Sequence, residues 1–181
     1  MVIPSYNVKI KFRIFLQEIY EVMDTQFYDG GVTGNTNNHW YNYGNRLSVS
    51  VDNTGTLLTS LNSQYGYYYP IQPSDEITDA NSYWFDTFIM EFDIVSTSST
   101  SNEIVMYNPV DPTTYISISY VGLTTSGGHI KIVYDGSNVK VFANDVLTVN
   151  FTKVFNQKFR VGFDVHPNES LKYKNFVIYP I

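Results

Sequence analysis

Two acids at alternate positions of an apolar stretch are the first pattern in this sequence with a chemistry of its own. Glu91 and Asp93 lie within residues 83–95, YWFDTFIMEFDIV. On a β-strand this spacing puts both carboxylates on one face. One carboxylate could then act as a nucleophile and the other as an acid and base in glycoside hydrolysis. A solvent-facing strand surface with two acids gives the same pattern.

Two aromatic stretches are the second kind of candidate site. Residues 27–45, FYDGGVTGNTNNHWYNYGN, contain five asparagines and no aliphatic residue except Val32, which predicts a loop or an irregular hairpin. Residues 64–70, QYGYYYP, predict a second aromatic loop or an edge strand. Aromatic rings stack on the apolar faces of sugars, while amide groups bond the hydroxyls. The predicted ligand-binding residues are Asn35, Asn37, Asn38, Trp40, Tyr41, Tyr43, Tyr65, Tyr67 and Tyr68, with Tyr69 beside them. Packing of a core or of a subunit interface would use the same rings.

The sequence offers few metal ligands. Asp29, followed by two glycines that let the backbone approach an ion, is the best single candidate, and Asp164 is the second. Oxygen ligands of this kind favour a structural calcium ion, although an aspartate in a turn is the simpler interpretation. His39, His129 and His166 lack the spacing of a zinc site, and there is no cysteine. The sequence also lacks a serine-hydrolase elbow and a nucleotide-binding glycine loop.

Composition narrows the function classes. The chain of 181 residues is 17% aromatic and only 15% charged, which is typical of an extracellular β-sandwich with an uncharged, hydrogen-bonding surface. Its net charge is −6, and Arg46 is the only lysine or arginine between Ile14 and Ile130. An acidic middle of this kind repels phosphate backbones, so we expect no nucleic-acid binding. No apolar run approaches the length of a membrane span, so we expect no membrane insertion.

Alternating apolar residues predict the elements that position these side chains. Residues 129–151 predict a three-strand meander in which Leu147, Val149 and Phe151 share a buried face. Trp84, within the stretch that predicts the central strand, is expected in the core. The remaining predicted strands are 46–52, 56–61, 103–107, 115–120, 158–165 and 171–179. Together these short strands and their turns predict an all-β sandwich or barrel.

The start of the chain is ambiguous. Residues 8–16 alternate as a strand with a basic outer face, but residues 12–23 also fit a short helix. We therefore predict an N-terminal extension or linker element over residues 1–24 and one β-sandwich domain over residues 25–181.

The order of these elements resembles a known superfamily. A long strand reading FIMEFDIV precedes IKIVYDGSNVKVFANDVL, and KFRVGFDV and KNFVIYPI follow. This order resembles the concanavalin A-like lectin and laminin-G-like superfamily, over roughly residues 85–181. The resemblance implies a two-sheet antiparallel jelly-roll sandwich. Hydrolases of this superfamily carry a third acid after an E-x-D pair, but Val95 and Ser96 occupy that place here. The texture of residues 29–45 also resembles adhesins and tail-tip proteins of archaeal viruses and proviruses.

We therefore predict a non-catalytic recognition domain, a lectin-like adhesin or receptor-binding protein. Its expected partner is a surface glycan or another cell-envelope receptor, and its expected location is extracellular, on a virion tail or a cell surface. An exposed strand edge and the gain from multivalency favour a homo-oligomer, and the second resemblance implies a trimer. Two alternatives remain open: a glycoside hydrolase that uses Glu91 and Asp93, and a purely structural or assembly protein.

Overall fold

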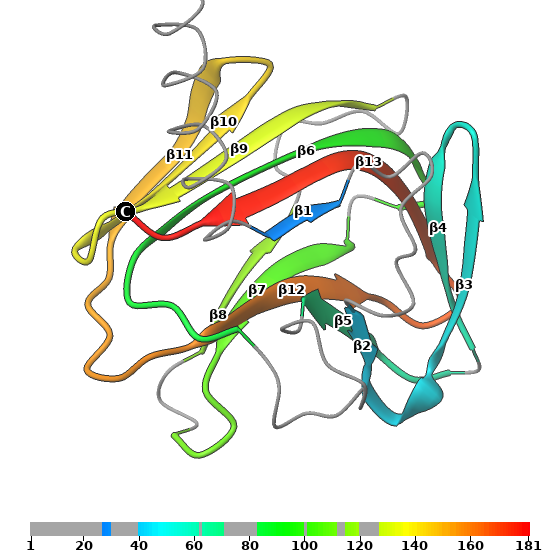
Figure 1. The fold of residues 1–181 in the computed structure, drawn as a ribbon, viewed down its shortest axis with the longest axis horizontal. Helices are drawn as coiled ribbons and strands as arrows, with labels where there is room; N and C mark the ends of the chain where they lie inside the picture. The colour runs from blue at the N-terminus through cyan, green and yellow to red at the C-terminus, as the bar shows by residue number, and fades with distance from the viewer. Residues whose placement is uncertain are drawn as a thin grey trace, which may run out of the picture.

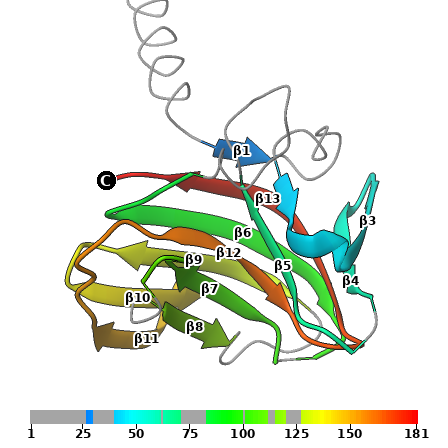
Figure 2. The same ribbon diagram turned by 90° about the horizontal axis from the view of Figure 1, so that it is seen from below.

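The protein is a sandwich of two antiparallel β-sheets. The computed structural model describes residues 27–29 (backbone only), 40–61, 63–70, 83–99, 101–111, 115–119 and 127–181. The predicted jelly-roll architecture is confirmed: the sheets stack face to face, as Figures 1 and 2 show. None of the helical turns in these ranges has the length and apolar character needed to span a membrane.

The larger sheet contains eight strands, of which seven follow the order β11-β10-β9-β6-β13-β4-β3 and the eighth, β1, pairs with β13 beside this path. Its members are β1 (Phe27–Asp29), β3 (Leu47–Asp52), β4 (Gly55–Ser60), β6 (Phe88–Thr97), β9 (Gly128–Tyr134), β10 (Asn138–Ala143), β11 (Val146–Thr152) and β13 (Ser170–Tyr179). β13 pairs with β6 along one edge, and with β4 and β1 along the other.

The smaller sheet has the order β2-β5-β12-β7-β8. Its members are β2 (Trp40–Asn42), β5 (Gly66–Pro70), β7 (Glu103–Tyr107), β8 (Tyr115–Ser119) and β12 (Arg160–Val165), and the 3-10 turn η2 (Tyr43–Asn45) follows β2. In Figure 1, the strands β7 and β12 are curved. The concave face of the smaller sheet is turned away from the larger sheet.

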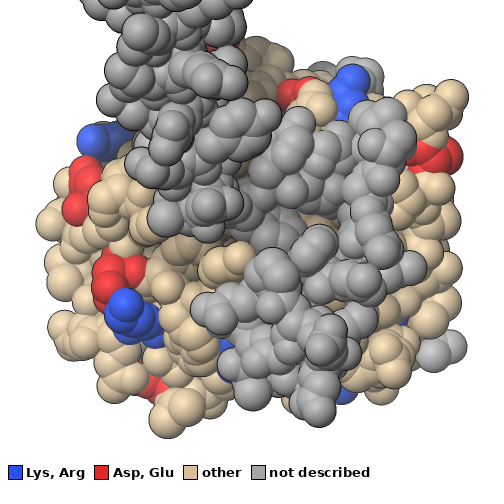
Figure 3. Space-filling view, in the orientation of Figure 1, with Lys and Arg blue, Asp and Glu red and all other residues tan. Residues whose placement is uncertain are grey.

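The core lies between the sheets, because each central strand turns its alternate apolar residues toward the other sheet. From the larger sheet these are Phe88, Met90, Phe92 and Ile94 of β6, each at most 3% exposed. From the smaller sheet they include Val161, Phe163 and Val165 of β12. The rings of Phe92 and Phe163 meet edge to face across the interface, with centroids 5.2 Å apart. The alternation of apolar residues along β6 and β12 therefore accounts for the centre of the core. Outside the core, Figure 3 shows acidic and basic residues at the described surface on one side of the molecule.

Three sequence predictions need correction. Leu147 is 48% exposed, because a bulge between Val141 and Phe142 of β10 leaves Thr148 of β11 without a partner residue and turns Leu147 outward. Trp84 is half-buried and lies outside the strands, with its ring under the Arg160 guanidinium at 4.6 Å. In the stretch 64–70, residues Gly66–Pro70 form an inner strand rather than an edge, because β2 pairs with β5 on the side away from β12. The predictions for residues 1–24 lie outside the described residues.

Candidate functional site

The outer face of the smaller sheet, turned away from the larger sheet, is lined by tyrosines. Phe163 of β12 points into the core, so its neighbours Gly162 and Asp164 face outward. The strand register carries this alternation across the sheet and brings six rings to the outer face or its rim. We call the six the tyrosine face: Tyr41 of β2, Tyr43 of η2, Tyr67 and Tyr69 of β5, Tyr107 of β7 and Tyr115 of β8.

Five of the six rings of the tyrosine face contact one another from strand to strand, and the sixth, Tyr115, is paired with Tyr107. The Tyr69 centroid lies 5.4 Å from Tyr41 and 6.1 Å from Tyr107. The Tyr67 centroid lies 6.4 Å from Tyr43 and 6.1 Å from Tyr107. Tyr43 and Tyr115 are the most open members, at 43% and 45% exposed, while Tyr69 is buried. Since five of the rings are held by ring neighbours and Tyr115 is fixed beside Tyr107 by the strand pairing, the face is a preformed aromatic surface with accessible edges.

Gly162 and Arg160 explain how the middle of this face packs. A Cβ atom on Gly162 would lie 2.6 Å from the Tyr68 carbonyl oxygen and 2.7 Å from Tyr69 Cβ, so only glycine fits. The guanidinium of Arg160, which is 5% exposed, lies over the rings of Trp84, Tyr69 and Tyr107 at 4.6, 5.4 and 6.0 Å. Its Nη1 donates a hydrogen bond to the Tyr69 hydroxyl. A buried cation thus holds the rings from one end.

An acidic cluster lies at the other end of the tyrosine face. Asp164 of β12 pairs directly with Glu103 of β7 and with Tyr67 of β5. Burial, followed by the negative charge of Glu103, raises the pKa of Asp164 to about 7. His166 follows two residues later, with its Nε2 3.8 Å from Glu103 Oε2 and its ring 4.7 Å from the ring of Tyr65. This end can exchange a proton near neutral pH or, when ionised, hold a cation.

Two phenols of the face, those of Tyr67 and Tyr115, stay protonated at neutral pH. Burial, followed by the charge of Asp164, raises the pKa of Tyr67 to about 12. Burial and the charge of Glu103 also raise the pKa of Tyr115. The hydroxyls of Tyr67 and Tyr115 can therefore both donate and accept a hydrogen bond.

A cavity of about 570 Å³ adjoins the tyrosine face where the sheet edges meet. Its described lining comes from β2, η2, β3 and β5: Trp40, Tyr41, Asn42, Gly44, Asn45, Leu47, Val49 and Tyr68. The side chain of Asn42 donates a hydrogen bond to the Leu47 carbonyl oxygen and accepts one from the Leu47 backbone N–H. These two bonds hold η2 in place as one wall of the cavity. This volume lies in the range of small-molecule sites, roughly 300–1,000 Å³.

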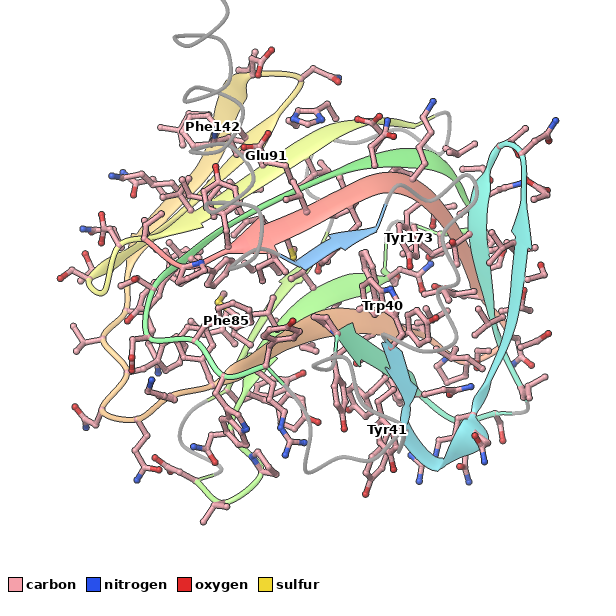
Figure 4. All side chains as sticks on the ribbon, viewed as in Figure 1. Trp40, Tyr41, Phe85, Glu91, Phe142 and Tyr173 are labelled. Carbon is pink, nitrogen blue, oxygen red and sulfur yellow. The ribbon has the colours of Figure 1, made fainter. Side chains whose placement is uncertain are left out.

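The predicted ligand-binding residues divide between the outer face and the core. Trp40 and Tyr68 are each 2% exposed and stack on one another in the core, so their rings cannot form a surface platform. The reason is strand alternation, which turns Tyr41 and Tyr67 outward when their neighbours point inward, and Figure 4 shows Trp40 and Tyr41 on opposite sides of β2. Tyr43 lies on the tyrosine face and Tyr65 lies against His166. Asn35, Asn37, Asn38 and the side chain of Asp29 lie outside the described residues.

Glu91 and Asp93 lie on the opposite side of the molecule, on the outer face of the larger sheet, far from Tyr41 in Figure 4. Their carboxylates are occupied by protein partners. His129 Nδ1 lies 2.8 Å from Asp93 Oδ1, and Lys131 Nζ lies 3.0 Å from Glu91 Oε1. Asn175 Nδ2 donates to Asp93 Oδ2 at 2.6 Å. These contacts describe a structural ion network rather than a carboxylate pair facing a groove.

Sequence reasoning missed half of the site. Tyr107, Tyr115, Glu103 and Arg160 were not singled out, although Glu103, Val105 and Tyr107 alternate with the apolar Ile104 and Met106. That alternation could have marked them as one outward row. Nothing local in the sequence shows that β7 lies beside β12 and β5.

Solved structures with the same fold include several proteins whose names refer to carbohydrate binding or to enzymes that act on carbohydrates. A protein of unknown function with a galectin-like fold from Bacillus subtilis is 10% identical, with a TM-score of 0.61 over 86% of this chain and 96% of that one. A CBM66 carbohydrate-binding module from Bacillus subtilis is 11% identical, with a TM-score of 0.56 over 78% and 95%. The Crh5 transglycosylase in complex with NAG is 8% identical, with a TM-score of 0.58 over 86% and 84%.

At these identities the likeness shows the fold alone, a jelly-roll sandwich shared by a binding module and an enzyme. No protein-family model matches the chain, and no curated protein sequence matches it. The predicted resemblance to viral tail-tip proteins stays a prediction.

Proposed function

We propose that this protein is a non-catalytic recognition domain that binds a glycan across the tyrosine face. The observation that carries the proposal is the set of five tyrosine rings in mutual contact on the outer face of one sheet, with Tyr115 paired to Tyr107 beside them and with open members at the rim. Tyrosine suits this role, because its ring stacks on the apolar face of a sugar and its hydroxyl bonds the sugar's hydroxyls.

The surroundings of the face support a neutral ligand with many hydroxyl groups. Arg160 is engaged by aromatic rings and Asp164 is buried, so neither offers an exposed charge. Rings whose positions are already set lose little conformational entropy on binding, which favours affinity from a small contact area.

The biological setting that we propose is a surface attachment protein, at a viral tail tip or on a cell surface. Its support is the asparagine- and tyrosine-rich composition of residues 27–45 and of the tyrosine face. Single-sugar sites are weak, and several copies held together bind much more tightly than one. A homo-oligomer, such as a trimer, would present several tyrosine faces together and so raise the overall affinity for a glycan surface.

Paired tyrosine variants test the proposal. Tyr67→Ala removes a half-buried ring of the tyrosine face, whereas Tyr179→Ala removes a half-buried tyrosine from the outer face of the larger sheet. On a glycan array, we expect Tyr67→Ala to lower affinity by about fivefold, because one stacked ring contributes on the order of 1 kcal/mol. We expect Tyr179→Ala to bind like the wild type.

Three outcomes would contradict the proposal. Equal loss in both variants would show that neither face is specific. Hydrolysis of a bound glycan that Glu91→Gln abolishes would make the protein a glycosidase. No glycan binding, together with an oligomer whose tyrosine fluorescence changes on dilution, would indicate an assembly protein with the tyrosine face at its interface.

A further inference from the structure

Three side chains with metal-ligand chemistry meet at one end of the tyrosine face. Glu103 on β7 and Asp164 on β12 are directly paired across the sheet, and His166 lies two residues beyond Asp164 on the same side. One ligand atom from each residue lies within 4.8 Å of the other two. An ion placed among them would reach two carboxylate oxygens and one imidazole nitrogen.

Two atoms of this cluster are buried and orphaned. Asp164 is 1% exposed, and its Oδ1 has no hydrogen-bond partner among the described residues. The Nε2 of His166, which faces Glu103, is likewise buried without a hydrogen bond in this part of the chain. A buried carboxylate oxygen without a partner destabilises the folded state, and native proteins seldom retain one without a reason. A cation among the three side chains would satisfy both atoms at once.

The opposite face of the molecule offers an internal comparison. Glu91, Asp93 and His129 are the same three residue types, again on neighbouring strands. There His129 lies between the two acids, with Nδ1 2.8 Å from Asp93 and Nε2 3.6 Å from Glu91, and Lys131 neutralises Glu91. In that cluster, other protein side chains already contact both carboxylates and the imidazole. The first cluster differs because Asp164 Oδ1 and His166 Nε2 are buried without a hydrogen bond from any residue that the structure describes.

We propose that Glu103, Asp164 and His166 bind a divalent transition-metal ion of the Zn²⁺ type. One imidazole and two carboxylates form a mixed nitrogen and oxygen donor set that suits zinc and its neighbours. Calcium prefers six to eight oxygen ligands, so three ligands with a nitrogen among them suit it poorly. Three protein ligands also leave a position open to water or to a ligand's oxygen. This proposal stands on the cluster alone and does not require that the tyrosine face bind a glycan.

Thermal unfolding of the chelator-treated full chain, with and without Zn²⁺, tests the proposal. We expect Zn²⁺ at about 100 times its Kd to raise the Tm by about 5–10 °C. Calorimetric titration should give one ion per chain, and Ca²⁺ at the same concentration should leave the Tm unchanged. Co²⁺ in place of Zn²⁺ provides an independent readout, because a protein-bound ion changes its visible spectrum.

Matched histidine variants locate the ion. His166→Gln should abolish the Tm shift and the Co²⁺ spectrum, whereas His129→Gln, which changes the comparison cluster, should retain both. Equal binding by the two variants, or no binding by the wild type, would overturn the proposal.

A variant of Asp164 tests whether a loss of Zn²⁺ binding could come from unfolding rather than from loss of a ligand. Asp164→Asn removes the buried orphaned carboxylate, so the metal-free variant should melt at or above the Tm of the metal-free wild type, with no further rise on adding Zn²⁺. A Zn²⁺-dependent rise that persists in Asp164→Asn would contradict the proposed ligand set. Should this variant fail to fold, Glu103→Gln replaces it with the same expected loss of binding.

Discussion

At the scale of single residues, Asp93 shows how a strand acid is held on a sheet surface. Burial acts to raise the pKa of Asp93. Hydrogen bonds from His129 and Asn175, with the charges of His129 and Lys174, outweigh it, so the net pKa lies below the ordinary value. A carboxyl whose folded pKa is depressed contributes stability that is present above its unfolded pKa, and that stability is lost as the pH falls through the folded pKa.

We predict that Asp93→Asn flattens the acid limb of the stability curve. Below about pH 4, the free energy of unfolding of the wild type should fall more steeply with decreasing pH than that of the variant. Urea unfolding from pH 6 to pH 2.5 measures both slopes. Asp86→Asn, which changes an exposed acid near Lys158, is the control. Identical slopes for Asp93→Asn and the wild type would show that these contacts do not act on folding.

The residues of the tyrosine face show what sequence reasoning can predict at this scale. The residue types and two of the segments were predicted, but not the direction of each ring. Tyr67, Tyr68 and Tyr69 are identical neighbours, so hydropathy gives no phase that would say which one points inward. The pairing of Tyr68 with Phe163, a core residue, decides it, and that partner lies about a hundred residues further along the chain.

At the scale of elements, the hairpin β10–β11 combines a predicted turn with an unpredicted irregularity. Asn144 and Asp145 form the turn, with φ of 49° and 65°, the left-handed region that a two-residue hairpin of this type requires. Asn144 also accepts a hydrogen bond from the His129 backbone through its side chain. The turn residues were readable from the sequence. The bulge at Thr148 was not, because threonine fits a regular strand equally well.

We predict that Asp145→Gly stabilises the protein. Glycine adopts the positive φ without the strain that a side chain causes there, so the free energy of unfolding should rise by about 0.5–1 kcal/mol. Asp145→Val, whose branched side chain resists this conformation, should lower it by about 1–2 kcal/mol. Chemical denaturation of the three proteins measures the order. A less stable glycine variant would show that Asp145 makes a contact worth more than its backbone strain.

At the scale of the whole molecule, Trp40 joins the two sheets. It comes from β2 of the smaller sheet, and its ring lies 4.8 Å from Phe176 and 5.8 Å from Tyr173 of β13 in the larger sheet. Figure 4 shows Trp40 and Tyr173 facing one another between the layers. A residue that the sequence assigned to ligand binding thus serves the core.

We predict that Trp40→Ala costs about 3–5 kcal/mol of unfolding free energy, as large-to-small changes of buried aromatic residues do. Tyr43→Ala, which removes an exposed ring from the adjacent turn, should cost far less. Guanidinium denaturation followed by circular dichroism compares the two. A small cost for Trp40→Ala would mean that β2 is not part of the cooperative unit.

Fold class was predictable because alternation is a local property that survives in almost every strand. The assignment of strands to sheets was not, since β13 lies between β6 and β4, which precede it by about 80 and 110 residues. Long-range pairing of this kind leaves no trace in a window of a dozen residues. The candidate site inherits the same difficulty, because its rings come from strands that only the pairing brings together.

The central place of β13 also has a consequence for synthesis on the ribosome. β1, β4 and β6 all pair with β13, yet all three are translated before it. Until residues 170–179 leave the exit tunnel, one edge of each of these strands lacks its partner, and the larger sheet cannot close. Folding of this sheet is therefore a late event that awaits a single segment, and the nascent chain must keep exposed strand edges from pairing with other chains until then.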